Sequence, residues 1–163
     1  MSAFTVRGQR VVVVGGAGSG VAAARLLVDR GALVTLTDLR PSLDHQDALA
    51  QIGVALSLGS HPVELFTGAD LVVVSPGVPA TEPSVAAARA AGVPVIGEVE
   101  LASRWLRGRI VAITGTKGKS TTTALTGRIL AAAGIHAPSA ATSARRSRPR
   151  WPSRGPSRST SSR

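Results

Sequence analysis

The chain has 163 residues, 44% of them hydrophobic, and its lack of cysteine excludes disulfides and thiolate metal sites. The net charge of +10 comes mainly from residues 138–163, which hold seven arginines and no acid; residues 1–137 hold twelve Lys or Arg against nine Asp or Glu. The body is therefore only mildly basic, and without a signal-peptide pattern or a bilayer-length apolar stretch we expect a cytoplasmic protein with no membrane partner.

Short apolar runs alternate with helical segments through most of the chain. The run "RVVVVG" is continuous, β-branched and ended by glycine, which is typical of a strand in a parallel sheet. The alternation predicts an α/β fold with a Rossmann-like parallel sheet, followed by the first strand, loop and helix of a P-loop ATPase-like domain. In chain order we expect strand 10–15, helix 19–31, strand 32–38, helix 41–53, strand 54–60, a short helix near 62–66, strand 70–77, helix 82–92, strand 93–97, helix 98–107, strand 109–115 and helix 119–134.

The first glycine loop, "GGAGSG" (15–20), joins a strand to a helix at the edge where such sheets bind ligands. Its spacing departs from the dinucleotide fingerprint G-x-G-x-x-G, because Ala17 stands at the second glycine when Gly15 is taken as the first. Bare backbone N–H groups at a helix start suit an anion. The alternative is a turn that only lets helix and strand pack closely, and this loop alone does not decide between them.

Asp38 ends the second strand, and Arg40 lies beside it. In a dinucleotide enzyme Asp38 would hold ribose hydroxyls, whereas an Asp and an Arg at one strand tip can also recognise a base edge or a sugar. The alternative is a helix-capping Asp with a solvated Arg. "SPGVP" (75–79) ends the fourth strand, and Gly77 there would let backbone approach a ligand; taken alone it is a turn.

The second glycine loop, "ITGTKGKST" (113–121), is the strongest signal in the sequence. Its backbone N–H groups can cradle phosphates, Lys119 supplies a positive charge, and the Ser120 hydroxyl is placed to ligate Mg²⁺. The full spacing G-x-x-x-x-G-K-[ST] would need glycine at position 113, where Ile113 stands, so this is a variant phosphate loop. We expect an ATP site to begin here.

Together these motifs resemble the Mur ligase family, and within it the D-glutamate-adding members, over residues 10–137. The resemblance implies a UDP-sugar-binding domain at 1–107 and the start of an ATP-binding central domain at 108–137. Lys117 stands where the family usually has asparagine. The motifs that carry the resemblance are "GTKGKST" (115–121), Ser19-Gly20, "TDLR" (37–40), "SPGVP" (75–79) and "GEVEL" (97–101).

The resemblance also implies an activity and a set of site residues. The D-glutamate-adding members couple D-glutamate to UDP-N-acetylmuramoyl-L-alanine, using ATP and Mg²⁺ to form an acyl phosphate, and full-length members act as monomers. Asp38 and Arg40 would contact the uracil, with Ser19 and Gly77 at the nucleotide sugar. Lys119 would be catalytic and Ser120 would hold magnesium. The ATP-binding residues would be Gly115, Thr116, Lys117, Gly118, Lys119, Ser120 and Thr121.

The tail, residues 138–163, has a composition that cannot bury a core. Codons can be chosen for Ala140–Arg146 so that a shifted frame encodes Gly-Asn-Ile-Gly-Thr-Pro, which resembles the family's continuation. We therefore expect a frameshift near residue 137 and a truncated chain that is inactive alone, because the family's Mg²⁺-binding glutamate, carbamylated lysine and third domain lie downstream. Residues 108–137 should then be loosely held.

Two alternatives stay open. One is an NAD(P)-binding Rossmann protein without ATP chemistry. The other is a basic nucleic-acid-binding module that uses its tail, although we expect no specific nucleic-acid partner.

Overall fold

The computed structural model describes residues 4–106 and 109–136, and the chain divides into two compact units, 1–108 and 109–163. The first unit has five strands and five helices in its described part, and residues 109–136 contain one helix. The strands are β1 (Arg10–Val14), β2 (Leu33–Asp38), β3 (Ala55–Leu58), β4 (Leu71–Val74) and β5 (Val95–Gly97). The helices are α1 (Gly18–Asp29), α2 (Gln46–Gln51), α3 (Val63–Thr67), α4 (Pro83–Ala90), α5 (Glu98–Ser103) and α6 (Lys119–Ala132).

The five strands form one parallel sheet in the order β3-β2-β1-β4-β5. The central strand, β1, pairs with β2 on one side and β4 on the other, so that Val14 lies opposite both Thr37 and Val74. A central parallel strand is covered on both faces, which explains why β1 is a continuous valine run. The sheet confirms the expected Rossmann-like α/β fold.

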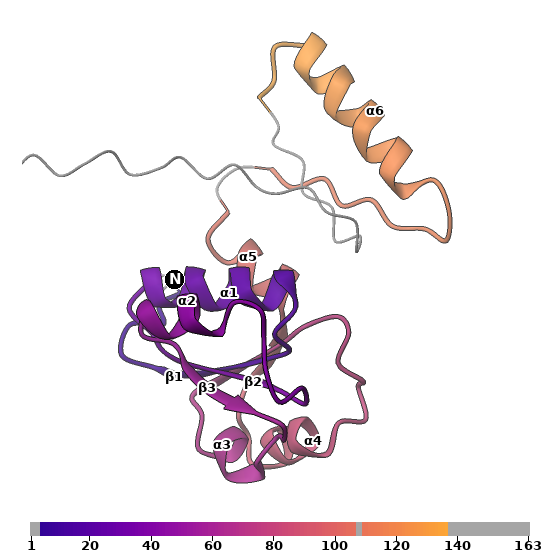
Figure 1. Cartoon of the computed structure of the whole chain (residues 1–163). Helices are drawn as coiled ribbons and strands as arrows, with labels where there is room; N and C mark the ends of the chain where they lie inside the picture. The colour runs from indigo at the N-terminus through magenta and orange to yellow at the C-terminus, as the bar shows by residue number, and fades with distance from the viewer. Residues whose placement is uncertain (1–3, 107–108, 137–163) are drawn as a thin grey trace, which may run out of the picture. The chain divides into compact units, whose positions relative to one another are not determined.

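Helices cover both faces of the sheet, with α1, α2 and α5 on one face and α3 and α4 on the other (Figure 1). Alternate residues of β1 point to opposite faces, as the strand period of two requires. Val11 and Val13 pack with Leu27 of α1, whereas Val12 and Val14 pack with Phe66 of α3. The two apolar cores therefore lie directly on either side of β1.

An aromatic cluster ties the N-terminal segment of the first unit to α5. The rings of Phe4 and Trp105 lie 5.1 Å apart between their centroids. The guanidinium of Arg30 lies 4.9 Å from the Trp105 ring centroid, and that of Arg104 lies 5.0 Å from the Phe4 centroid. Cation–π attraction thus joins the N-terminal segment with the residues that follow α1 and α5.

Two expected elements differ from the structure. The helix expected over 41–53 is short, because α2 begins only at Gln46 with His45 as its N-cap residue. The prediction of a strand over 109–115 was wrong, because these residues form no strand in the structure. A strand is stable only where a neighbouring strand completes its backbone hydrogen bonds. The described part of the second unit offers no such neighbour.

The second unit shows little burial where it is described. Helix α6 contains no buried residue, although it spans 14 residues. Ile110, Val111, Leu125 and Ile129 are each between 57% and 65% exposed. The tail (138–163), with the proposed frameshift, lies outside the described residues.

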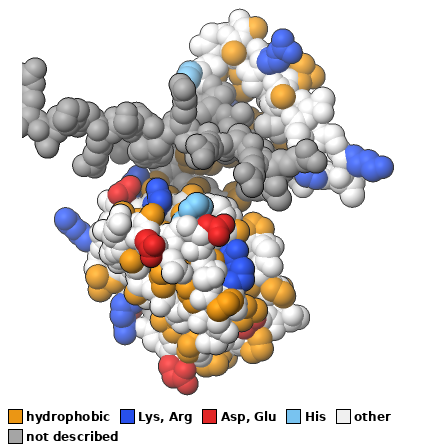
Figure 2. Space-filling model, in the orientation of Figure 1, with side chains coloured by type: hydrophobic (Ala, Val, Ile, Leu, Met, Phe, Trp, Pro, Cys, Tyr) orange, Lys and Arg blue, Asp and Glu red, His pale blue; other side chains and the backbone are white. Residues whose placement is uncertain are grey.

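Surface charge in the first unit is mixed. Residues 4–106 contain seven arginines, no lysine and nine Asp or Glu. Red and blue side chains are interspersed on the face of this unit that Figure 2 shows. None of the helices described is long and apolar enough to cross a membrane.

Candidate nucleotide-binding site

The loop after β1 lies at the carboxyl edge of the sheet and depends on glycine for its shape. Gly15 has φ +102°, and its N–H donates to Thr37 O at 2.8 Å. A Cβ placed on Gly20 would lie 1.9 Å from Gly15 O, so any side chain there would collide with backbone. The close-packing interpretation of this loop therefore holds for Gly20, whereas a Cβ on Gly18 would meet open space.

The same loop leaves backbone donors free at the start of α1. The N-cap residue Ala17 makes no side-chain cap hydrogen bond, and the first turn contains no acidic residue. The N–H groups of the first helical turn have no carbonyl partner within their own helix. Ser19 lies in this turn and is exposed, so the loop keeps the donor-rich, uncapped helix start that an anion requires.

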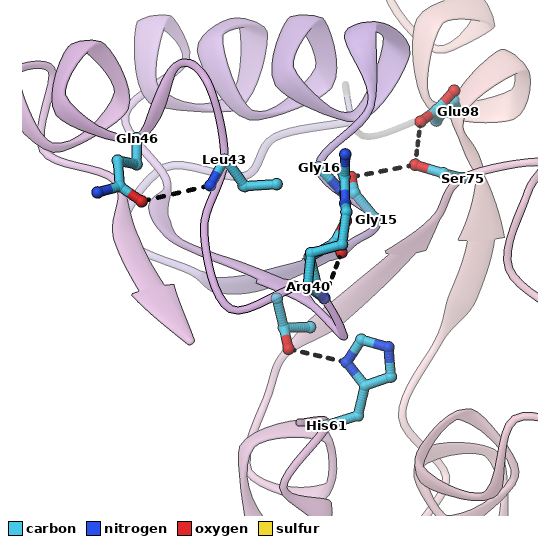
Figure 3. Close-up of polar contacts among 10 residues, drawn as sticks. Gly15, Gly16, Arg40, Leu43, Gln46, His61, Ser75 and Glu98 are labelled. Carbon is cyan, nitrogen blue, oxygen red and sulfur yellow. Dashed lines mark hydrogen bonds and ion pairs between the residues drawn. The ribbon is translucent and has the colours of Figure 1, made fainter. Parts of the chain in front are cut away.

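Asp38 is the centre of the polar network at this edge, and Figure 3 shows its partners Gly16 and Arg40 close together. One carboxylate oxygen, Oδ2, accepts from Gly16 N at 2.6 Å and from Arg40 Nη2 at 2.8 Å. The other, Oδ1, accepts from Arg40 N and Arg40 Nε, both at 2.9 Å. The Asp38 side chain thus fixes the glycine loop and the Arg40 guanidinium in one arrangement. Asp38 therefore pairs with Arg40 and does not cap α2, while the Arg40 side chain stays partly exposed to solvent.

Electrostatics follow from this geometry. The Arg40 side chain, through its hydrogen bonds to the carboxylate, holds the pKa of Asp38 well below its usual range, and the Arg40 and Gly16 amides add to the effect while burial opposes it. In return, the Asp38 carboxylate raises the pKa of Arg40. The Asp38 side chain is 12% exposed and that of Arg40 is 56% exposed. The guanidinium is therefore both fixed and open to a ligand.

Ser75, directly after β4, joins the glycine loop to α5. Its hydroxyl donates to a carboxylate oxygen of Glu98, the first residue of α5, and lies 3.4 Å from Gly15 O (Figure 3). Ser75 is 5% exposed. Gly77, two residues further on, is exposed, and a Cβ there would meet nothing within 4 Å.

The loop between β3 and α3 contributes a histidine to this edge. Thr37 Oγ1 lies 2.9 Å from His61 Nδ1 and donates to Ser60 O at 3.0 Å. Ser84 Oγ donates to His61 O at 2.6 Å. His61 is therefore anchored from β2 and α4.

The second glycine loop lies in the other unit and is built around the start of α6. Gly115 and Gly118 have φ values of +151° and +79°, and Gly118 is the N-cap residue of α6. No acidic residue lies in the first turn of the helix, and Lys119 Nζ donates to Gly115 O. The positive φ values of these glycines shape a loop that contains backbone N–H donors and the Lys119 ammonium. Phosphates bind to donors of this kind.

Comparison with known proteins decides the family. Residues 9–97 match the family model described as "Mur ligase MurD-like, N-terminal domain". The chain belongs to the Mur ligase family. Two of its curated relatives are named UDP-N-acetylmuramoylalanine–D-glutamate ligase: one from Anaeromyxobacter dehalogenans (strain 2CP-C) is 58% identical over 134 residues, and one from Syntrophotalea carbinolica is 52% identical over 125.

Solved Mur ligase structures share this fold. The pseudomurein peptide ligase type C of Methanothermus fervidus has a TM-score of 0.53 and 29% identity over 77% of this chain and 26% of its own. UDP-N-acetylmuramate-alanine ligase of Thermotoga maritima has a TM-score of 0.52 and 25% identity over 76% of this chain and 29% of its own. The alignments to the two curated relatives cover 80% and 76% of this chain, which spans less than a third (29% and 28%) of their length.

ATP and Mg²⁺, which the Mur ligase family implies, fit the donors found at 115–121. Left-handed glycines at the start of a 14-residue helix suit phosphate oxygens, and a serine hydroxyl is a hard ligand of the kind that Mg²⁺ prefers. The described residues contain no group of three or more His, Asp or Glu that could hold a metal ion. Ser120 remains the predicted metal ligand in this loop.

The structure joins some of the predicted Mur ligase site residues and adds others. It brings Asp38 and Arg40 into direct contact. Ser19 lies in the first turn of α1 and Gly77 in the loop after β4, and among the described residues neither has a side-chain hydrogen bond to that pair. Sequence reasoning assigned no role to Ser75, Glu98 or His61. The first two lie in "SPGVP" and "GEVEL", directly after β4 and β5, so the rule that ligands bind at carboxyl ends of strands could have found them.

Proposed function

We propose that this chain supplies the UDP-sugar-binding unit, residues 1–107, and the beginning of the ATP-binding unit, residues 108–137, of a ligase that adds D-glutamate to UDP-N-acetylmuramoyl-L-alanine. Support comes from its membership of the Mur ligase family and from the names of its relatives. The observation that carries the proposal is the fixed, half-exposed guanidinium of Arg40 beside a phosphate-type glycine loop. It offers directed donors to the carbonyl oxygens of a uracil.

In the first unit, the donor-rich start of α1 would bind the diphosphate. Ser19 lies in the first turn of that helix, and Gly77 provides a surface that a sugar can approach closely. Asp38 would act through Arg40, because four hydrogen bonds already use its two oxygens. The nucleoside would therefore meet Arg40 first.

In the second unit, Gly115 to Thr121 would hold the ATP phosphates. Bound ATP would supply a phosphoryl group to the substrate carboxylate, giving an acyl phosphate and ADP, and the amine of D-glutamate would then displace inorganic phosphate to form the amide. Lys119 would stabilise negative charge on that group, with Lys117 close by in the loop and Ser120 on the magnesium ion. Release of the Lys119 ammonium from the Gly115 carbonyl would free it for this role.

The NAD(P) alternative is disfavoured by the same geometry. A dinucleotide enzyme uses the acidic residue at the end of the second strand to accept the ribose hydroxyls. Here the Asp38 carboxylate accepts from Gly16 and Arg40 instead. The nucleic-acid alternative rests on the tail, since residues 4–106 carry more acidic than basic side chains.

Calorimetric titration of the chain with UDP and with NADH tests the proposal, at about 0.3 M salt to screen the basic tail. We expect UDP to bind and NADH to give no heat. Arg40→Ala should weaken UDP binding about tenfold, through loss of a charge-assisted hydrogen bond. The matched control is Arg10→Ala, because Arg10 also pairs with an aspartate, Asp70, but at the amino end of β1. Tighter binding of NADH than of UDP would refute the proposal.

A further inference from the structure

The register of three neighbouring strands places Glu98 in line with the first glycine loop. The last residues of β1, β4 and β5 lie opposite one another in the sheet: Val14, Val74 and Gly97. The next residue of each segment, Gly15, Ser75 and Glu98 in turn, therefore lies at the carboxyl edge, where ligands of such sheets bind. Strand pairing thus puts a carboxylate one residue away from the loop, with a serine between them.

The Ser75 side chain packs directly against the backbone of the glycine loop. Its hydroxyl lies 3.4 Å from Gly15 O, and Figure 3 shows Ser75 between Gly15 and Glu98. A Cβ added to Gly15 would lie 3.0 Å from Ser75 Oγ, and one added to Gly20 would lie 2.9 Å from the same atom. Ser75 therefore contacts both ends of loop 15–20, and a change in its side chain changes the space that the loop occupies.

Glu98 determines which way the Ser75 hydroxyl points. A serine hydroxyl has one hydrogen, and two acceptors lie near it: a Glu98 carboxylate oxygen and Gly15 O. The carboxylate is the stronger acceptor, and its contact with Ser75 Oγ is the shorter one. Without the carboxylate the hydrogen would turn to Gly15 O, and shortening that contact to an ordinary length of about 2.8 Å would displace the loop.

The charge of Glu98 gives no reason for its place near a site for phosphates, because like charges repel. The Glu98 side chain is half-buried at the first turn of α5, and no ion pair among the described residues involves it. Its hydrogen bond to the buried Ser75 hydroxyl is the contact that can influence the loop.

We propose that Glu98 is a positioning residue for the diphosphate of the nucleotide sugar. By holding Ser75, it fixes loop 15–20, whose backbone N–H groups at the start of α1 would bind the phosphates; this inference rests on the proposed UDP-sugar function. Positioning and simple electrostatics predict opposite results. Loss of Glu98 weakens UDP binding if the residue positions the loop, whereas removal of a negative charge by itself would tighten it.

The test measures UDP and uridine binding by the full 163-residue chain, with amide NMR titrations that also show whether each variant is folded. Glu98→Ala removes the acceptor of the Ser75 hydroxyl, whereas Glu98→Gln removes the charge and keeps an oxygen that can accept from Ser75. Ser75→Ala removes the hydroxyl. The matched control is Glu100→Ala, because Glu100 lies on the same helix, is exposed and pairs with Arg104.

We expect Glu98→Ala to weaken UDP binding about fivefold to tenfold, the range of one hydrogen bond, and to leave uridine binding unchanged, because uridine has no diphosphate. Glu98→Gln should keep most of the UDP affinity. In a chain that already carries Ser75→Ala, Glu98→Ala should have no further effect, since Glu98 acts through Ser75. Glu100→Ala should change neither affinity.

Several results would overturn the inference while leaving the proposed function intact. These are unchanged or tighter UDP binding by Glu98→Ala, an equal loss of UDP and uridine binding, which a purely structural residue would give, and additive losses in the double variant. If Glu98→Ala does not fold, Glu98→Met replaces it, because methionine keeps the side-chain length without a strong acceptor. Failure of the unmodified chain to bind UDP would instead refute the proposed function, and the inference with it.

Discussion

Replacing Asp38 with alanine should strongly destabilise the first unit. The substitution removes the acceptor of the part-buried Gly16 N–H and the partner of the Arg40 guanidinium. A hydrogen bond from a part-buried amide to a charged group contributes about 1.5–3 kcal/mol, and the ion pair adds about 0.2–1 kcal/mol because the Arg40 side chain is 56% exposed. We expect the free energy of unfolding to fall by about 2–4 kcal/mol.

Urea unfolding followed by tryptophan fluorescence measures this change. Trp105 packs against Phe4 in the first unit, so its emission should report the unfolding of that unit. The other tryptophan, Trp151, is removed by Trp151→Phe in all variants. Asp70→Ala is the matched control, because Asp70 also accepts from a backbone N–H and an arginine, Arg10, but at an exposed site. Asp70→Ala should therefore change the free energy of unfolding little.

The effect of Asp38→Ala should also depend on pH. The folded-state pKa of Asp38 is lowered, so the ionised carboxylate stabilises the fold above its unfolded pKa of about 3.9, and this contribution is lost as pH falls below that value. The difference between the unmodified and the alanine chains should therefore shrink between pH 7 and pH 3. A loss below about 0.5 kcal/mol at pH 7, within the range of an ordinary surface substitution, would refute the reasoning.

Three further predictions concern the glycine loop, α6 and turnover. Gly20→Ala should destabilise the first unit by about 3 kcal/mol or more because its Cβ would lie 1.9 Å from Gly15 O, whereas Gly18→Ala should be neutral; thermal melting compares the two, and equal melting temperatures would contradict the packing argument. Amide hydrogens of α6 should exchange much faster than those of β1 and β4, because α6 buries no side chain; protection of α6 equal to that of β1 would show packing that its exposure does not indicate. The chain alone should release no ADP when given UDP-N-acetylmuramoyl-L-alanine, D-glutamate, ATP and Mg²⁺, since it spans less than a third of its relatives' length; turnover comparable to a complete ligase would refute this.

Some features were readable from the sequence because they depend on local chemistry. Alternating apolar runs and glycine stops predicted the five strands of the first sheet, since a buried parallel strand must be apolar on both faces. The same rule placed the glycine loop and Asp38 at one edge. It failed at 109–115, where an apolar run has strand character but no neighbouring strand among the described residues to complete its hydrogen bonds.

Other features were decided only by the tertiary structure. The hydrogen bonds of Ser75 and His61 join residues far apart in sequence: Glu98 for Ser75, and Thr37 and Ser84 for His61. No local sequence pattern predicts which hydroxyl will form a hydrogen bond with which carboxylate or imidazole, because strand order and loop packing set the distances between these groups. The pairing of Arg40 was likewise decided by the fold, which closes the Gly16 loop and the Arg40 side chain onto a single carboxylate.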